Sequence, residues 1–152
     1  MDVNEISEED DDIDWNARRH FVVAIMVWHP LRDLAVLTDA LGRTPFRCRQ
    51  AGQPRTTMRG DPRPGVWPQS YWVARRRAEG RRDFFEAVGE EVTALEGCAA
   101  LVERILAEGG EVNLKIELPG EHNIGDVMPA AMLRRLGALG VGLDVEVFPD
   151  MA

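Results

Sequence analysis

The amino-acid sequence predicts an α+β fold: a ferredoxin-like βαββαβ sandwich with an appended αβ unit, in which helices cover one face of a mainly antiparallel sheet. Two observations support this prediction. Segments with strand-like and helical patterns follow one another in the order that this arrangement requires. The chain has 152 residues, which is the size of one ordinary domain, and its longest apolar run has eight residues, far fewer than the ~20 that span a bilayer.

The first half of the chain is expected to contain three strands and one helix. Their expected ranges are 21–28 for the first strand, 30–41 for the helix, 46–50 for a short second strand, 51–66 for a long loop and 66–75 for the third strand. Every residue of the first strand is apolar, which is typical of a central strand covered on both faces. The helix begins favourably at Pro30 and ends before Gly42. The second strand alternates, with Arg47 and Arg49 on its solvated face.

The second half is expected to contain two helices and two strands. Their expected ranges are 82–108 for a long helix, 112–118 for a strand, 129–139 for a short helix and 141–147 for the last strand. The apolar residues of the long helix step by three and four and form one stripe: Phe85, Val88, Val92, Leu95, Ala99, Val102 and Leu106. A bend is expected near Gly97 and Cys98, because a glycine inside a helix costs roughly 1 kcal/mol relative to alanine.

Residues 1–16 are predicted to be a disordered acidic leader, followed by a single domain at 17–152. Residues 1–14 contain eight acidic side chains and no basic one, so they bury too little apolar surface to offset the entropy of ordering. The leader is interpreted either as a solvated tail that aids solubility or as an intramolecular competitor that lies over the basic part of the chain. Two cysteines in different elements and the absence of a signal peptide favour free thiols in the cytoplasm.

Positive charge is concentrated in residues 43–82. This segment contains eleven arginines and two acidic residues, so its net charge is +9, whereas the net charge of the whole chain is −8. Surface ion pairs contribute only ~0–1 kcal/mol each, so stability is a weak reason to concentrate so many arginines. Guanidinium groups bind carboxylates and phosphates through paired hydrogen bonds and stack on aromatic rings. The candidate binding residues are Arg49, Arg55, Arg59, Arg63, Trp67 and Trp72.

A structural interpretation of the same residues is also open. In it, the arginines pair with the glutamates of the long helix, and Trp67 anchors the loop by packing into the core. The sequence alone does not decide between a displayed and a neutralised set of arginines.

No spacing in the sequence indicates a catalytic or metal-binding site. The three histidines are scattered, and no paired histidine or cysteine motif occurs. His29 precedes Pro30 and is expected at the junction between the first strand and the helix. Cys48 is expected to be buried, because in an alternating strand it points away from Arg47 and Arg49. The sequence therefore predicts no catalytic residue, no metal ligand and no cofactor.

Several short motifs follow one another over about residues 20–150. They are Leu41-Gly42 with Pro45, a loop with Gly52, Arg55, Gly60 and Asp61, Gly65-Val66-Trp67, a long acidic-apolar helix, Gly109-Gly110 and a final Leu143-Asp144-Val145-Glu146-Val147-Phe148. This series resembles the bacterial "domain of unknown function 4279" family. The acidic leader and the arginine-rich loop depart from that family's pattern. The resemblance implies an intracellular bacterial domain without an established activity, and it supplies no catalytic residues.

From these observations we expect a non-catalytic binding module of a bacterial cytoplasmic protein. Its arginine-rich loop would engage an acidic protein partner, in an immunity or accessory role. One alternative is a regulator that binds an anion or single-stranded nucleic acid, with Trp67 and Trp72 stacking on bases; an enzyme is the least favoured alternative. Self-association or a partner protein over the first strand is a further hypothesis, because the second apolar face of that strand would otherwise be an unusual exposed patch. No membrane partner is expected.

Overall fold

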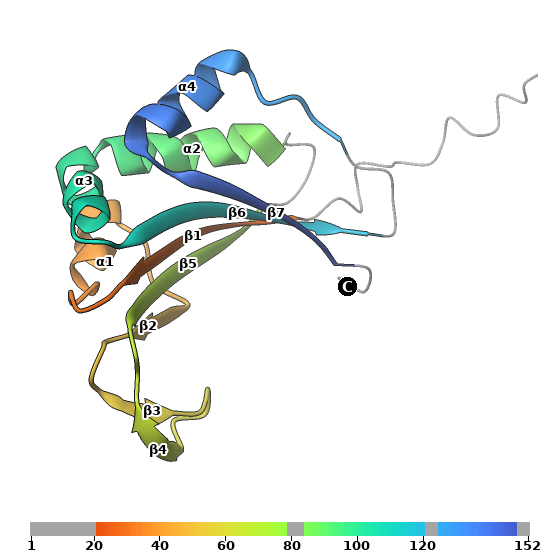
Figure 1. Ribbon diagram of the computed structural model, residues 1–152. Helices are drawn as coiled ribbons and strands as arrows, with labels where there is room; N and C mark the ends of the chain where they lie inside the picture. Colours follow the sequence, from red (N-terminus) through yellow and green to blue (C-terminus); the bar gives the residue numbers. More distant parts are fainter. Residues whose placement is uncertain (1–20, 79–83, 121–124, 149–152) are drawn as a thin grey trace, which may run out of the picture.

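The computed structural model describes residues 21–78, 84–120 and 125–148 (Figure 1). The predicted acidic leader lies outside these residues. Within them, the main sheet consists of β1 (Phe21–His29), β2 (Arg47–Arg49), β5 (Ser70–Ala78), β6 (Glu111–Pro119) and β7 (Gly142–Phe148). The strand order is β2-β5-β1-β6-β7, and every neighbouring pair is antiparallel except β6 and β7, which are parallel. The prediction of a mixed α+β fold with a mostly antiparallel sheet is confirmed.

Strand β1 is central in the sheet, as its uniformly apolar sequence predicts. It pairs with β5 along one edge and with β6 along the other. Alternate side chains of a strand point to opposite faces. The set that joins the main core is Phe21, Val23, Ile25 and Val27, and the set on the opposite face is Val22, Ala24, Met26 and Trp28. We call this second face the open face of the sheet.

Four helices are present in the described part of the chain: α1 (Val36–Leu41), α2 (Phe84–Glu96), α3 (Ala99–Ala107) and α4 (Ala130–Leu139). Their buried side chains join one core cluster with the first set of β1, and Figure 1 shows α2, α3 and α4 on one side of the sheet. None of the helices in these ranges has both the length and the apolar character needed to cross a membrane.

The predicted long helix is divided into α2 and α3 at Gly97 and Cys98, where a bend was expected. The division changes the phase of the apolar stripe. On α3 the buried residues are Val102 and Ile105, whereas Ala99, which the uninterrupted stripe includes, is exposed. A single helical period therefore does not describe both halves of this segment.

Helix α1 is shorter than the predicted helix. The His29 Nδ1 atom accepts hydrogen bonds from the main-chain N–H groups of Leu31 (3.0 Å) and Arg32 (2.6 Å). The Asp33 Oδ1 atom accepts another from the N–H of Ala35 (2.9 Å). Such bonds offer the main chain an alternative to helical hydrogen bonds. The helix consequently begins only after Ala35.

The predicted loop at residues 51–66 contains a hairpin of two short strands, β3 (Pro54–Thr56) and β4 (Pro62–Val66). Figure 1 shows the hairpin on the side of the sheet away from α2 and α4. Main-chain and side-chain atoms of Thr57 and Asp61 close the turn, with the Asp61 N–H donating to Thr57 Oγ1 (3.1 Å). Every residue of both strands is exposed, so no apolar alternation indicates them in the sequence.

Candidate functional site

Arg43, Arg75 and Arg76 of the basic segment are paired with carboxylates of the described residues. Arg43 Nε lies 3.1 Å from Glu91 Oε2, and Arg76 Nη2 lies 3.1 Å from the other oxygen of the same carboxylate. Arg75 Nη2 lies 2.5 Å from Glu117 Oε2. Glu91 belongs to α2 and is only 3% exposed. For Arg43 and Arg76 the predicted pairing with glutamates of the long helix is confirmed, whereas the partner of Arg75 is a glutamate of β6.

Trp72 is a core residue. Its side chain is fully buried on the helix-covered face of the sheet. Its Nε1–H donates a hydrogen bond to Thr38 Oγ1 at 3.2 Å. The indole is therefore not available at the surface to stack on a ligand.

Arg49, Arg55 and Trp67 are brought together, and we call them the Trp67 cluster. The guanidinium carbons of Arg49 and Arg55 lie 4.0 and 5.5 Å from the centroid of the Trp67 indole. Two main-chain hydrogen bonds hold Trp67 at the base of the hairpin: its carbonyl accepts from the Gly52 N–H and its N–H donates to the Gln53 carbonyl, both at 2.9 Å. The indole is half-buried, under arginines rather than within the core.

A cavity of about 420 Å³ lies beside the Trp67 cluster. Its lining includes Trp28 and Tyr71, whose ring centroids are 5.2 Å apart. Tyr71 is in register with Arg49 on β2 and with Trp28 on β1. Residues in direct register share one face of a sheet. The three side chains therefore form a row across the open face that ends at the Trp67 cluster.

The charge of the Trp67 cluster is not neutralised by any carboxylate of the described residues, since no ion pair of Arg49 or Arg55 occurs among them. Burial lowers the pKa of the Arg49 guanidinium, and the nearby charges of Arg47 and Arg55 lower it as well. Like charges held close together repel, and a bound anion relieves that repulsion. The arrangement favours an anionic ligand.

Arg59 and Arg63 lie on the hairpin, apart from the Trp67 ring. Arg59 is in the turn between the two strands and Arg63 is on β4, and both are exposed. Neither forms an ion pair with a carboxylate of the described ranges. They extend the positive surface beyond the cluster without contributing to its stacked core.

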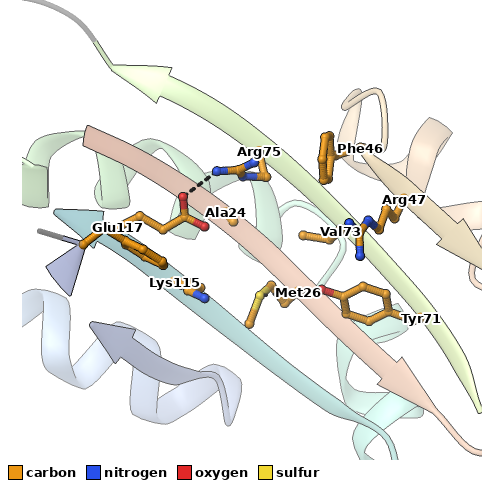
Figure 2. A pocket seen from close by; sticks show the side chains of 10 residues that line it. Ala24, Met26, Phe46, Arg47, Tyr71, Val73, Arg75, Lys115 and Glu117 are labelled. Carbon is orange, nitrogen blue, oxygen red and sulfur yellow. Dashed lines mark hydrogen bonds and ion pairs between the residues drawn. The ribbon is translucent and has the colours of Figure 1, made fainter. Parts of the chain in front are cut away.

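A second cavity, of about 340 Å³, lies on the open face (Figure 2). Its apolar floor is formed by Ala24, Met26 and Val73, from two adjacent strands. The rings of Phe46 and Phe148 also line it. We call this cavity the open-face hollow. No sequence pattern indicates this hollow, because it depends on the register that brings β2, β5, β1, β6 and β7 side by side.

The three cations of the open-face hollow differ in their partners. Arg75 reaches across β1 to Glu117 (Figure 2), and Lys115 Nζ lies 2.6 Å from a glutamate oxygen of β7. Arg47 Nη2 donates only to the Met58 Sδ atom (2.8 Å), a weak acceptor, and its Nε is buried without a hydrogen-bond partner among the described residues. Of the three cations, only Arg47 therefore lacks a carboxylate partner among the described residues.

His29 is a structural residue at the end of β1, as the sequence predicts. Because its Nδ1 accepts two main-chain N–H groups, the ring proton lies on Nε2, which is 3.0 Å from Glu108 Oε2. His20 and His122 lie outside the described residues. In the part of the chain that the structure describes, no group of three or more His, Cys, Asp or Glu side chains is placed to hold a metal ion.

Cys48 is exposed, contrary to the prediction that it is buried. Strand β2 is at the edge of the sheet, so the helix layer does not cover this position. Partial burial of the sulfur raises the pKa of the Cys48 thiol, and the charge of Asp33 raises it further. The neighbouring arginines therefore do not activate this thiol.

No model of a known protein family matches this chain, and no curated protein and no solved structure matches it either. The resemblance to the "domain of unknown function 4279" family stays a prediction. The Trp67 cluster and the open-face hollow are the features from which a function can be inferred.

Proposed function

We propose that this protein is a non-catalytic binding module that engages an acidic protein partner through the Trp67 cluster and the hairpin. The observation that carries this proposal is the stacking of two guanidinium groups on Trp67 without a carboxylate partner among the described residues. Acidic residues outnumber basic ones in the whole chain by 26 to 18. In such a chain, arginines that lack a carboxylate are suited to the anionic groups of another molecule.

The distribution of the charge favours a protein over a small anion. Positive side chains extend from the edge strand β2 to the turn of the hairpin, over a wider area than one small anion contacts. Trp28, Tyr71 and Trp67 lie among them, and tryptophan, tyrosine and arginine are the side chains that contribute most to binding at protein interfaces. An acidic protein surface would contact the whole area, and complementary charge would also accelerate its association.

We retain the finer elements of the sequence prediction as parts of this proposal. The strand order β2-β5-β1-β6, with β1 antiparallel to both neighbours, supports a ferredoxin-like arrangement, and α4 with the parallel strand β7 supports the appended αβ unit. The two cysteines are unpaired, which supports a bacterial cytoplasmic protein. An immunity or accessory role is the biological setting that we propose.

One observation favours a second candidate function, the binding of an anion or of single-stranded nucleic acid. Trp67, Trp28 and Tyr71 lie beside Arg49 and Arg55, which form no ion pair within the described ranges, and bases stack on aromatic rings in such grooves. Trp72, which the sequence also indicates for this candidate, is excluded by its burial.

The two functions are distinguished with two probes, poly-glutamate and a mixed-sequence single-stranded oligonucleotide. Each is titrated into the wild type, the double variant Arg49→Glu/Arg55→Glu, and the control Arg134→Glu, which changes an exposed arginine of α4 in the helix layer. We expect poly-glutamate to bind the wild type and the control but not the double variant. Saturable oligonucleotide binding with a steep salt dependence would favour the second candidate. Absence of binding by both probes would contradict both functions.

A further inference from the structure

We propose that the acidic partner binds as an extended segment across the open face, with acidic side chains at alternate positions and one aromatic side chain in the open-face hollow. This inference rests on the proposed function and adds the conformation and chemistry of the partner's segment to it.

The spacing of the arginines on β2 suits an extended segment. Arg47 and Arg49 are two positions apart on this strand and share its open face. Side chains two positions apart in a strand are separated by about 6.6 Å, and an extended partner has the same repeat. Acidic side chains at positions i and i+2 of the partner therefore face both guanidinium groups. Arg55 of the Trp67 cluster is placed for a further acidic side chain beyond Arg49.

Arg47 gains most from such a partner. Its guanidinium carbon lies 5.4 Å from the centroid of the Phe46 ring, its Nη2 donates to a thioether sulfur, and its Nε has no hydrogen-bond partner among the described residues. A carboxylate accepts two parallel hydrogen bonds from one guanidinium and is a much stronger acceptor than sulfur. Reorientation of the Arg47 side chain toward a bound carboxylate replaces weak contacts with strong ones.

The open-face hollow fits an aromatic side chain that is adjacent to acidic ones. Its exposed apolar surface belongs mainly to Phe46, which is 50% exposed, and Phe148, which is 37% exposed. Arg75 lies over the Phe46 ring (5.1 Å) and Lys115 over the Phe148 ring (5.7 Å). An aromatic side chain of the partner, placed between Phe46 and Phe148, contacts the apolar surface of the hollow. The carboxylates next to it in the partner remain close to Arg75 and Lys115.

The hollow and the cavity of the Trp67 cluster are neighbours on the sheet. Tyr71 lines both cavities, and its hydroxyl group is 3.9 Å from the sulfur of Met26 in the floor of the hollow. Along β2, the sites for the partner therefore follow one another from Arg49 to Arg47 and then to the hollow beside Phe46. This order predicts acidic, any, acidic, any, aromatic as the pattern of the segment, in one chain direction or the other.

The test uses the full chain and four labelled peptides. The first has the sequence Glu-Ser-Glu-Ser-Glu-Ser-Phe and the second is its reverse. The third and the fourth are made in the direction of whichever of these two binds more tightly. The third carries Ser in place of Phe, and the fourth groups the three glutamates at the end away from Phe. Affinities are measured for the wild type, for Phe46→Ser, and for the control Val127→Ser, which changes an exposed apolar residue outside the hollow.

We expect one of the first two peptides to bind most tightly. Replacing its Phe by Ser weakens binding to the wild type and to the control about tenfold, but changes binding to Phe46→Ser little. Grouping the glutamates weakens binding several-fold. An equal effect of the Phe replacement on wild type and Phe46→Ser, or equal affinity for grouped and alternating glutamates, would overturn the inference. The four peptides have the same net charge, so equal binding of all four would overturn only the inference and would leave the proposed function unchanged. If neither the peptides nor poly-glutamate bound, the proposed function would be contradicted as well.

Two further outcomes assign the hollow to other occupants and would equally overturn the inference. One is a stable dimer of the wild type that Phe46→Ser converts to a monomer, which would identify a second copy as the occupant. The other is peptide binding that appears only when the eight acidic residues of 1–14 are changed to their amides in the full chain. That result would identify the acidic leader as the occupant.

Discussion

The guanidinium carbon of Arg49 lies 4.0 Å from the centroid of the Trp67 indole and thereby connects the edge strand β2 to the base of the hairpin. A contact between a cation and an aromatic face contributes about 0.5–2 kcal/mol and leaves the charge in place. The contact therefore orders the arginine side chain. Unlike an ion pair with a carboxylate, it does not neutralise the charge. A site that is ordered and still charged is suited to capture an acidic partner.

Replacing Trp67 by alanine should loosen the hairpin and weaken anion binding. The change removes the ring on which Arg49 and Arg55 lie, so we expect the free energy of unfolding to fall by about 1–2 kcal/mol. Urea unfolding followed by circular dichroism measures this, and Trp67→Phe, which keeps an aromatic face, should retain part of the stability and of the poly-glutamate binding. Full binding by Trp67→Ala would show that the stacking is unimportant.

Replacing Thr38 by valine should destabilise the core through Trp72. The change leaves the buried Nε1–H of Trp72 without its acceptor, at a cost of roughly 1–3 kcal/mol. In a Trp72→Phe background the same Thr38→Val change should cost much less, because the donor is already absent. A double-mutant cycle of the two changes measures their coupling free energy. Additive effects would show that the hydrogen bond between Trp72 and Thr38 does not stabilise the fold.

Glu91 should matter more for stability than its exposed neighbour Glu90. Glu91 is buried between Arg43 and Arg76, so Glu91→Gln should lower the free energy of unfolding by roughly 1–3 kcal/mol. Glu90→Gln removes an exposed ion pair and should cost about 0–1 kcal/mol. Chemical denaturation of both variants gives the comparison, and equal costs would show that burial of Glu91 is not decisive.

The ion pairs of Glu108 should make a pH-dependent contribution to stability. The hydrogen bond from Arg32, followed by the contact with His29, lowers the pKa of Glu108 from its ordinary value of 4.5. Its stabilising contribution is therefore fully present above pH 4.5 and is lost as the pH falls through the lower folded-state value. The stability difference between wild type and Glu108→Gln should shrink in acid. A difference that stays constant or grows as the pH falls would contradict this, and Glu103→Gln on α3 serves as the control.

Neither thiol should be unusually reactive. Burial raises the pKa of both Cys48 and Cys98 above the ordinary value of 9.0. The thiolate is the reactive form. Alkylation of each cysteine at pH 7 should therefore be slower than that of a free cysteine peptide, and its rate should continue to rise with pH beyond 9, where the rate of the free peptide levels off. Fast alkylation of Cys48 at pH 7 would indicate that Arg47 and Arg49 lower its pKa after all.

The sequence predicted those elements whose side chains are buried in a regular pattern. The uniformly apolar β1, the alternating β6 and the division of the long helix at Gly97 follow from apolar periodicity and from glycine. The sequence does not indicate the hairpin, because β3 and β4 bury no side chain and therefore show no alternation of apolar and polar residues. The late start of α1 depends on hydrogen bonds made by His29, which no pattern of apolar residues reveals.

The site was predicted only in part for a similar reason. Composition indicated Arg49, Arg55 and Trp67, because arginines and aromatic residues are concentrated in one segment. Trp72 was included although it points into the core, because adjacent residues of a strand face opposite sides and the sequence does not say which side is covered. Tyr71, its neighbour, faces the open side and lines both cavities.

The most direct test of the account is an NMR titration of the ¹⁵N-labelled chain with poly-glutamate, observed at the indole N–H signals of its four tryptophans. The Trp67 signal should shift in a saturable manner, together with that of Trp28 in the adjoining cavity, whereas the buried Trp72 signal should remain unchanged. The shifts should disappear in Arg49→Glu/Arg55→Glu. Saturable binding that leaves the Trp67 signal unmoved, or identical shifts in wild type and double variant, would contradict the proposed role of the Trp67 cluster.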